Sequence, residues 1–341
     1  MSTDSTHTSL TPPNPDTTTV TTPSKSPLRK RGWLDWINSS LVAAALIGLI
    51  VIFTVASPYF FTSLNWYHIL QAVAVVAVLT IGQAFVIITA GIDLSQGSVI
   101  GLAGVVSALI MSAGHPVWEG LLAGLLIGAV VGAINGILVV LAQLPPFIAT
   151  LATLSIAEGA ALIVTGGQPV FNLPASFTNF GQYGLGILPY TALVAIALAI
   201  IFHLLLAYTR FGRFTYAVGS NVIAARLSGL KVGRQLFLVY LLSGILSAIG
   251  GMLLTAYVSS ALPTGGANYE LNSIAAVVIG GGSLFGGEGT IWGSMLGALL
   301  MAVLSNGTQL LGVSTYWQEV LLGLVVVIAV YVDHFRRRVS V

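Results

Sequence analysis

Cysteine is absent from this chain of 341 residues, and charged side chains are scarce. Without cysteine, neither disulfides nor metal sites built on thiolates can form. Charged residues make up 6% of the sequence, whereas soluble domains carry about 25%. So small a charged fraction cannot keep a protein of this size dissolved in water. The sequence therefore belongs to the class of proteins whose solvent is the lipid bilayer.

Apolar residues are abundant: hydrophobic types make up 56% of the chain, and its mean hydropathy is +0.97. A helix needs roughly 20 apolar residues to cross a bilayer. Breaks rich in Gly, Pro or polar residues divide the apolar sequence into about ten such segments. They are expected near 38–56, 69–89, 97–113, 118–142, 147–166, 188–208, 235–258, 271–285, 290–310 and 316–333. The predicted fold is an all-α polytopic membrane protein, in which the third and eighth spans are short.

The 12 basic residues fall into three clusters, which set the orientation of the chain. The clusters are Lys25, Arg29, Lys30 and Arg31; Arg210, Arg213, Arg226, Lys231 and Arg234; and Arg336, Arg337 and Arg338. Lys and Arg are enriched in cytoplasmic loops, so all three clusters are expected in the cytoplasm. Six spans before the middle cluster and four after it satisfy this, with both termini cytoplasmic.

The chain is expected to have one membrane domain between two short tails. Residues 1–35 are rich in Thr, Ser and Pro, which predicts a disordered cytoplasmic tail. No apolar run lies near the start, so this tail is not read as a signal peptide. The membrane domain then covers 36–335, and 336–341 form a second cytoplasmic tail.

Two segments without basic residues are predicted on the opposite face of the membrane, at 167–189 and 259–270. Their Gly, Pro, Asn and aromatic residues are typical of compact loops. Such loops can be docking surfaces for a partner or plain connectors on the membrane surface.

The cytoplasmic segment 210–234 is much longer than a connector needs to be. A short helix is predicted over 221–230, with Asn221 as its N-cap and Gly229 near its end. Arg226 is expected to face water. The apolar side chains available for packing are Val222, Ala225 and Leu227. From the pattern alone, this helix could also be an amphipathic anchor at the membrane surface.

This segment resembles the cytoplasmic signature of ribose-type sugar ABC importer permeases. The resemblance lies in Gly212, Arg213, Tyr216, Ala217, Val218, Gly219, Asn221 and the run Ala224–Gly229. Ser220 stands where that family usually has a second Gly. The resemblance implies that the loop supplies a coupling helix that docks into a cytosolic ATPase. The residues implied in docking are Arg213, Asn221, Ala225, Arg226, Leu227, Ser228 and Gly229.

A second motif occupies 86–98. Gly91 is expected to interrupt a helix, and the side chains of Asp93 and Ser95 to cap the next one. Without such partners, Asp93 would be costly at the membrane border; direct contact with a solute is the other reading. The run from Ile92 to Ser98, with Gly97, is similar to a hallmark of the ribose-type family. It favours that branch over the related branched-chain amino-acid permeases.

A third motif lies in 269–333 and is dense in glycine. The residues singled out as a structural or translocation motif are Gly280, Gly281, Gly286, Gly287 and Asn306. Glycine allows close approach of helices and broken helices covered by protein. The stretch lacks the Lys-Ser/Thr ending of a P-loop, so it is not expected to bind nucleotide. Compared with the family, Asn272, Gly282 and Glu288 are departures.

Glu158 is predicted in the middle of the fifth span. An ionisable residue there marks a candidate pathway residue, although a hydrogen bond between helices explains it equally well. His68 and His203 are expected at the membrane interfaces. No Ser-His-Asp or metal-ligand arrangement is found, so no catalytic residue, metal or cofactor is expected.

The resemblance implies a subunit of a larger assembly in the bacterial inner membrane. Two copies, or one copy and a homologue, would form the path for a monosaccharide or related small polar solute. The implied partners are a cytosolic ATPase, a periplasmic or lipid-anchored sugar-binding protein and membrane lipid, without nucleic acid. The alternative is a secondary transporter or channel that works alone, for which Glu158 and Asp93 would be the coupling acids.

Overall fold

The computed structural model describes the backbone of residues 31–339 and the side chains of residues 42–331 except 329. The predicted N-terminal tail therefore lies outside the described residues except for 31–35, which form the start of the first helix. The helices are α1 (Arg31–Ala56), α2 (Ser63–Ile88), α3 (Gln96–Ser112), α4 (Val117–Val140), α5 (Pro146–Thr165), α6 (Ala175–Gln182), α7 (Tyr190–Tyr208), α8 (Arg210–Ser220), α9 (Val222–Leu227), α10 (Val232–Val258), α11 (Tyr269–Ile279), α12 (Ile291–Leu310) and α13 (Thr315–Val339). The strands β1 (Gly184–Leu185) and β2 (Leu188–Pro189) form a small antiparallel hairpin.

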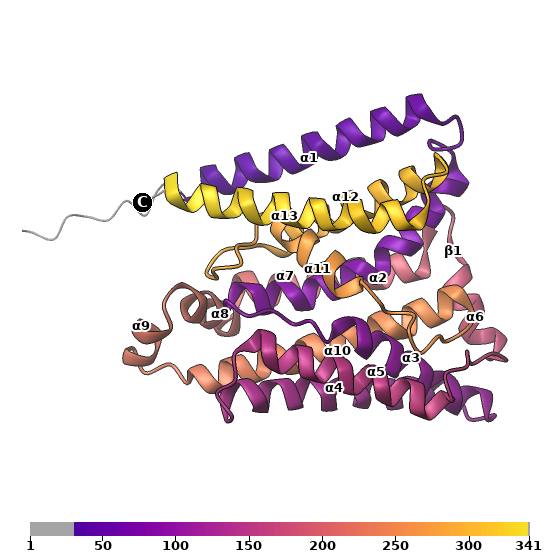
Figure 1. Ribbon diagram of the computed structural model, residues 1–341, viewed down its shortest axis with the longest axis horizontal. Coiled ribbons are helices and arrows are strands. Elements are labelled where there is room, and N and C mark those ends of the chain that lie inside the picture. The colour runs from indigo at the N-terminus through magenta and orange to yellow at the C-terminus, as the bar shows by residue number, and fades with distance from the viewer. Residues whose placement is uncertain (1–30, 340–341) are drawn as a thin grey trace, which may run out of the picture.

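The long helices run side by side along one axis of the molecule (Figure 1). The short helices α8 and α9 lie at one end, where α13 also ends. The helix α6 and the hairpin lie at the opposite end. The two loop regions that the sequence assigns to opposite sides of a membrane are thus at opposite ends of the bundle.

Six helices in the described residues are long and apolar enough to cross a membrane, which confirms an all-α membrane fold. These are α2, α4, α5, α7, α10 and α12. Shorter apolar stretches occur in α1 (42–56), α3, α11 and α13 (315–328). Together they coincide with the ten predicted regions; that all ten cross the bilayer remains a prediction.

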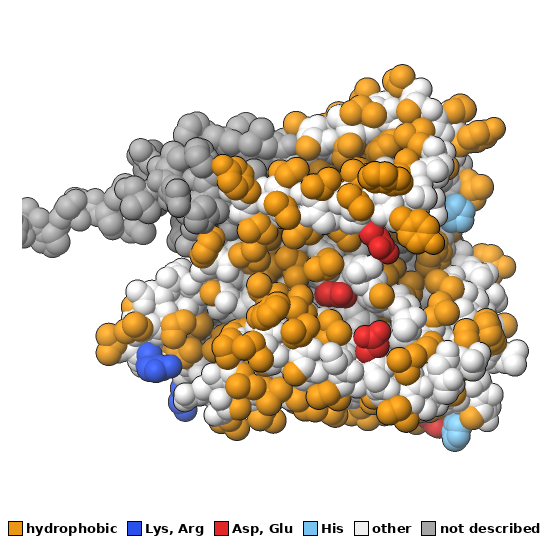
Figure 2. All heavy atoms as spheres, in the orientation of Figure 1, with side chains coloured by type: hydrophobic (Ala, Val, Ile, Leu, Met, Phe, Trp, Pro, Cys, Tyr) orange, Lys and Arg blue, Asp and Glu red, His pale blue; other side chains and the backbone are white. Residues whose placement is uncertain are grey.

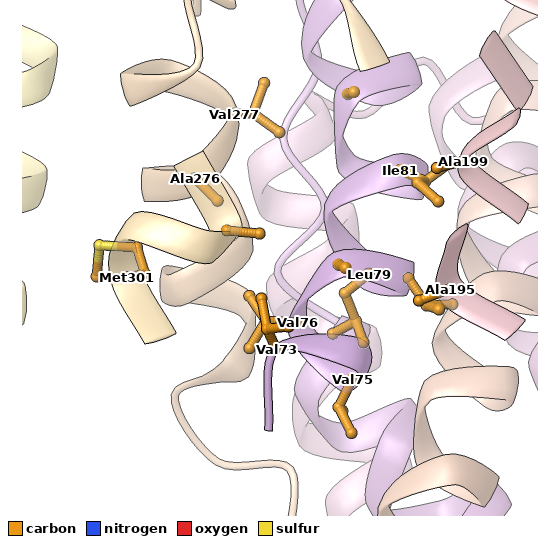
Figure 3. Packing of buried hydrophobic residues seen from close by; sticks show 14 of the residues in the cluster. Val73, Val75, Val76, Leu79, Ile81, Ala195, Ala199, Ala276, Val277 and Met301 are labelled. Carbon is orange, nitrogen blue, oxygen red and sulfur yellow. The ribbon is translucent and has the colours of Figure 1, made fainter. Parts of the chain in front are cut away.

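The core of the bundle is built around α2. Its side chains are buried on all sides from Val73 to Ile88, which is typical of a central helix covered by other helices. Figure 3 shows Val73 and Val76 facing the side of α11 and α12, while Ile81 lies beside Ala199 of α7.

Several predicted spans differ at their boundaries, and the structure gives a local reason for three of them. The second span begins earlier, at Ser63, because the Thr62 hydroxyl accepts a hydrogen bond from the N–H of Asn65 at 3.3 Å. The eighth ends at Ile279 rather than 285, because Gly281 adopts a left-handed backbone with φ 93°. The sixth begins at 190 because residues 188–189 belong to the hairpin.

The two halves of the chain share one pattern. A long helix, α2 or α10, is followed by a non-helical segment, 89–95 or 259–268, and then by a short helix, α3 or α11. Each short helix packs against the long helix of the other half, α3 on α10 and α11 on α2. The segment 89–95 is mostly buried, as is required of non-helical backbone at membrane depth, whereas 259–268 keeps several exposed residues.

Candidate functional site

Asp93 lies in the segment between α2 and α3, and its side chain is only 1% exposed. Its Oδ1 accepts hydrogen bonds from the backbone N–H of Ser95 at 3.0 Å and from the Ser95 hydroxyl at 2.6 Å. Its Oδ2 accepts a bond from the hydroxyl of Ser243 on α10 at 2.6 Å. These donors offset the cost of burying a carboxylate. Asp93 therefore holds the residue just before α3 but does not accept an N–H of the helix itself, as the predicted cap would.

Ser95 differs from its prediction. It occupies the N-cap of α3, but its side chain makes no hydrogen bond to an N–H of the helix. Its hydroxyl instead donates a hydrogen bond to Asp93 and accepts one from Asn135 Nδ2 on α4 at 2.8 Å. Asn135 Oδ1 in turn accepts a bond from the hydroxyl of Thr153 on α5 at 2.6 Å. The serine thus joins the start of α3 to two neighbouring helices.

A second branch runs from Ser243 to α11. Gln96 Nε2 donates to Ser243 Oγ at 3.0 Å, and its Oε1 accepts a bond from Ser273 at 2.7 Å. All three residues are fully buried. We call the whole set the Asp93 network: Asp93, Ser95, Gln96, Asn135, Thr153, Ser243 and Ser273. It joins α3, α4, α5, α10 and α11 through side-chain hydrogen bonds.

The helix break assigned to Gly91 is made by its neighbours. The helix α2 already ends at Ile88, and the left-handed residue is Ala90, with φ 62°. Gly91 has another function in the packing, because a β carbon there would overlap the hydroxyl of the buried Tyr240. The missing side chain lets α10 approach the break closely.

The segment 210–234 contains the predicted short helix. Asn221 caps α9 as expected, because its Oδ1 accepts the N–H of Ala224 at 2.9 Å. The helix spans Val222–Leu227, shorter than the predicted 221–230. The preceding helix α8 was not predicted; the hydroxyl of Thr209 caps it by accepting the N–H of Gly212 at 3.4 Å.

Packing of α9 differs from the expectation. Ala225 is buried beside Val218 and Val232, but Leu227 is 85% exposed and Val222 is 39% exposed. Of the three apolar side chains expected to be available for packing, only Ala225 packs within the bundle, because one turn and a half at the end of the bundle can bury only a single face. The remaining residues implied in docking, Arg213, Arg226, Ser228 and Gly229, are all exposed.

The glycine-rich loop after α11 joins α8 to the end of α2. Gly287 donates its N–H to the carbonyl of Ile88 at 2.8 Å. The hydroxyl of Tyr216 on α8 donates to the carbonyl of Gly289 at 2.6 Å. A β carbon on Gly219 would overlap the carbonyl of Ile88, and Gly286 packs against the carbonyl of Gly219. Backbone atoms of three segments thus meet beside the break that leads to Asp93.

Other residues of the third motif lie on contacts of α12. Gly280 packs directly on the backbone of Gly293, where neither position has room for a β carbon. Asn306 and Asn65 of α2 exchange two side-chain hydrogen bonds, both 2.9 Å long. These contacts agree with close helix packing by small and polar residues.

Glu158 lies on α5 and is half-buried. It lines a cavity of about 110 Å³ together with Gly97 and Glu270. A β carbon on Gly97 would overlap the carboxylate of Glu270, so that glycine makes room for the acid. The structure thus brings Glu158 and Gly97 together at one site, apart from the cytoplasmic segment. Among the described residues, no three His, Cys, Asp or Glu side chains come together as a metal site would require.

Most residues of the Asp93 network were not identified from the sequence. Gln96, Asn135, Thr153, Ser243 and Ser273 were not singled out from it. Polar residues inside long apolar runs were the available signal, since buried polar groups need hydrogen-bond partners. Which of these polar residues bond to each other could not be predicted, because the partners lie far apart in the sequence; Gln96 and Ser243 are 147 positions apart.

The described residues thus form a helical membrane bundle with two non-helical breaks after long helices and a short exposed helix at one end. Residues 65–330 match the family described as branched-chain amino acid transport system / permease component. The chain belongs to this family.

Similar proteins narrow the position of the chain within that family. Ribose import permease protein RbsC of Bacillus subtilis is 45% identical over 289 residues, covering 84% of this chain and 89% of the relative. RbsC of Escherichia coli K12 is 40% identical over 306 residues, 88% of this chain and 94% of the relative. Galactose/methyl galactoside import permease protein MglC of E. coli K12 is 34% identical over 333 residues, 91% and 98% of the two chains. No solved structure matches the chain. The chain is a sugar ABC importer permease and a multi-pass protein of the inner membrane.

Proposed function

We propose that this chain forms, as a dimer or with a homologue, the membrane path of an ATP-driven importer for a monosaccharide or related small polar solute. An external binding protein delivers the solute, and a cytosolic ATPase supplies the energy. The observation that carries the proposal is the likeness to ribose and galactose permeases over most of both chains. The chain itself lacks a nucleotide-binding motif, in keeping with hydrolysis by a partner.

The exposed helix α9 is the proposed coupling helix. Ile223 and Leu227 present apolar side chains that are 73% and 85% exposed, at the end of the bundle beyond the long helices. Exposed apolar side chains of this kind are typical of a docking surface for a protein partner. The contacts of α8 with the loop 280–289 and with Ile88 give a route by which movement of the ATPase reaches the Asp93 network.

The proposed topology has ten spans with both termini in the cytoplasm. The basic residues Arg210, Arg213, Arg226, Lys231 and Arg234 all lie in or beside α8 and α9. The end of α13 lies at the same end of the bundle as these two helices (Figure 1). Both observations agree with one cytoplasmic end under the positive-inside rule.

The external binding protein would dock at the opposite end of the bundle. There Val170 and Ala261 form an isolated bridge with hydrogen bonds of 2.9 and 3.0 Å, which joins the two external loops predicted at 167–189 and 259–270. The helix α6 covers this end, with Gln71 of α2 donating to the carbonyl of Gly181 at 3.0 Å. A rigid external surface of this kind suits docking of a preformed partner.

The alternative, a secondary transporter that works alone, rests on Glu158 within α5. A double substitution of Arg226→Glu and Ser228→Trp on the exposed end of α9 separates the two. It should abolish co-purification of the ATPase and solute uptake while the protein stays in the membrane. Normal uptake by this variant would contradict the importer.

A further inference from the structure

Two neighbouring cavities in the surface of the protein contain many polar lining residues, and together we call them the groove. The smaller, about 110 Å³, has the polar lining residues Ser98, Glu158, Thr264, Asn268 and Glu270. The larger, about 250 Å³, has the polar lining residues Asn268, Asn272, Ser305, Thr308, Thr315, Gln318 and Glu319. Because Ala267 and Asn268 line both cavities, the two cavities lie next to each other.

The groove lies beside the short helices that follow the non-helical segments 89–95 and 259–268. Both short helices begin at it: α3 contributes Ser98 from its first turn, and α11 contributes Glu270. The segment 263–268 forms the wall between them. Glu158 completes the site from α5. The first half of the chain thus contributes one carboxylate, Glu158, and the second half contributes two, Glu270 and Glu319.

The surroundings of the groove are strongly apolar. Figure 2 shows acidic side chains in the middle of a face that is otherwise covered mainly by hydrophobic side chains. On α5 itself, Ile156 and Ile163 are 69% and 83% exposed. Ionisable groups that face lipid are costly and therefore usually face a water-filled cavity or another protein. The groove is therefore the part of this face that is not built for lipid.

One carboxylate oxygen in the groove lacks a partner. Oε2 of Glu270 is buried and makes no hydrogen bond with the described residues. Buried polar groups are almost always paired, so water or a solute in the neighbouring cavity is an available partner for this acceptor. Glu158 lies across the same cavity and can supply a second acceptor.

We infer that Glu158 and Glu270 are contact residues for a polyhydroxylated solute on its way through the membrane. Vicinal hydroxyls donate to carboxylates, while the hydroxyls and amides of Ser98, Thr264 and Asn268 can both donate and accept. None of the described residues that line the two cavities is Lys, Arg or His, so the groove does not suit an anion. This inference rests on the proposed function and names the part of the chain that would face the path.

Paired substitutions test the inference in proteoliposomes that hold the chain with its ATPase, with D-ribose and D-galactose as probes delivered by the binding protein. Glu158→Leu and Glu270→Leu should lower the initial uptake rate by about tenfold or more, because hydrogen bonds to a charged group are lost. Glu158→Gln and Glu270→Gln keep hydrogen-bonding atoms and should transport at close to the normal rate. ATP hydrolysis stimulated by the loaded binding protein should persist in all four variants.

Each outcome decides one point. Uptake at the normal rate by the leucine variants would overturn the inference. Glutamine variants as slow as the leucine variants would also overturn it, because the negative charge itself would then be needed, as for a cation. Glu119→Leu, which removes an acid outside the groove, is the matched control and should have no effect. If the unsubstituted complex shows no ATP-driven uptake, the proposed function fails, and not merely this inference.

Cysteine accessibility gives a second test that does not depend on the leucine variants folding. The chain has no native cysteine, so single thiols can be introduced directly. A charged thiosulfonate reacts with thiolates, which form in water but not in lipid. It should modify Glu158→Cys, but should leave Ile156→Cys unmodified although that position is 69% exposed. Equal reactivity at both positions would overturn the inference.

Discussion

The hydroxyl of Ser243 on α10 donates a 2.6 Å hydrogen bond to Oδ2 of Asp93, which lies 150 positions earlier in the chain. Gln96 donates to the same serine oxygen at 3.0 Å. Ser243 lies on the long helix of the second half of the chain. Its hydroxyl therefore supplies the hydrogen bond to Oδ2 of a buried carboxylate in the first half. This contact makes Ser243 the residue on which the two halves depend most directly.

Replacing Ser243 with alanine should destabilise the protein more than an ordinary serine substitution. It removes one donor to a buried carboxylate and one acceptor for Gln96, and each unsatisfied group costs about 1–3 kcal/mol. The thermal unfolding midpoint in detergent should fall clearly. Ser155→Ala is the control, because that hydroxyl is exposed and bonds only to the carbonyl of Leu151. Equal midpoints for the two variants would show that the Asp93 contact is unimportant for stability.

Gly219 should not tolerate even one added methyl group. A β carbon there would overlap the carbonyl of Ile88 and approach the N–H of Gly287 at 2.7 Å. Gly219→Ala should therefore separate α8 from the end of α2 and lower both thermal stability and coupled transport. Gly159→Ala tests the same change where nothing lies within 4 Å, and it should be neutral or slightly stabilising in the helix. Normal transport by Gly219→Ala would contradict the proposed route through this junction.

The exposed leucine of α9 should contribute to binding of the ATPase. Leu227→Asp places a charge where an apolar contact is proposed and should weaken association by about tenfold or more, in line with a central interface residue. Association can be measured by titrating the purified ATPase onto the chain in nanodiscs. Leu185→Asp, in the hairpin at the other end, changes a residue that is 64% exposed and should leave this affinity unchanged. If Leu185→Asp weakened association and Leu227→Asp did not, the ATPase would bind at the end opposite to α9, which would contradict the proposal.

Asn65 and Asn306 should behave as a coupled pair. Each donates one 2.9 Å hydrogen bond to the other, so Asn306→Leu leaves Asn65 with unpaired groups and should cost about 1–2 kcal/mol. The double variant with Asn65→Leu should cost less than the sum of the two single changes. Unfolding midpoints of the four proteins measure this coupling. Strictly additive effects would contradict a direct contact between α2 and α12.

Local signals in the sequence predicted much of the fold. Apolar runs located the spans, and Asn221 marked the start of α9 correctly because capping depends on neighbouring residues. The left-handed residue is Ala90, whereas the sequence pointed to Gly91 as the break, so local signals did not locate it. Backbone strain and burial depend on which helices surround a segment. The Asp93 network was out of reach for the same reason, because its partners come from five helices.

The energy source of transport is the property that tests the proposed importer function most directly. The chain can be reconstituted in proteoliposomes with its ATPase, and uptake of D-ribose and D-galactose measured with and without the binding protein. Uptake should require ATP and the binding protein together and should be indifferent to an imposed proton gradient. Uptake by the chain alone, driven by a proton gradient without ATP, would contradict the account.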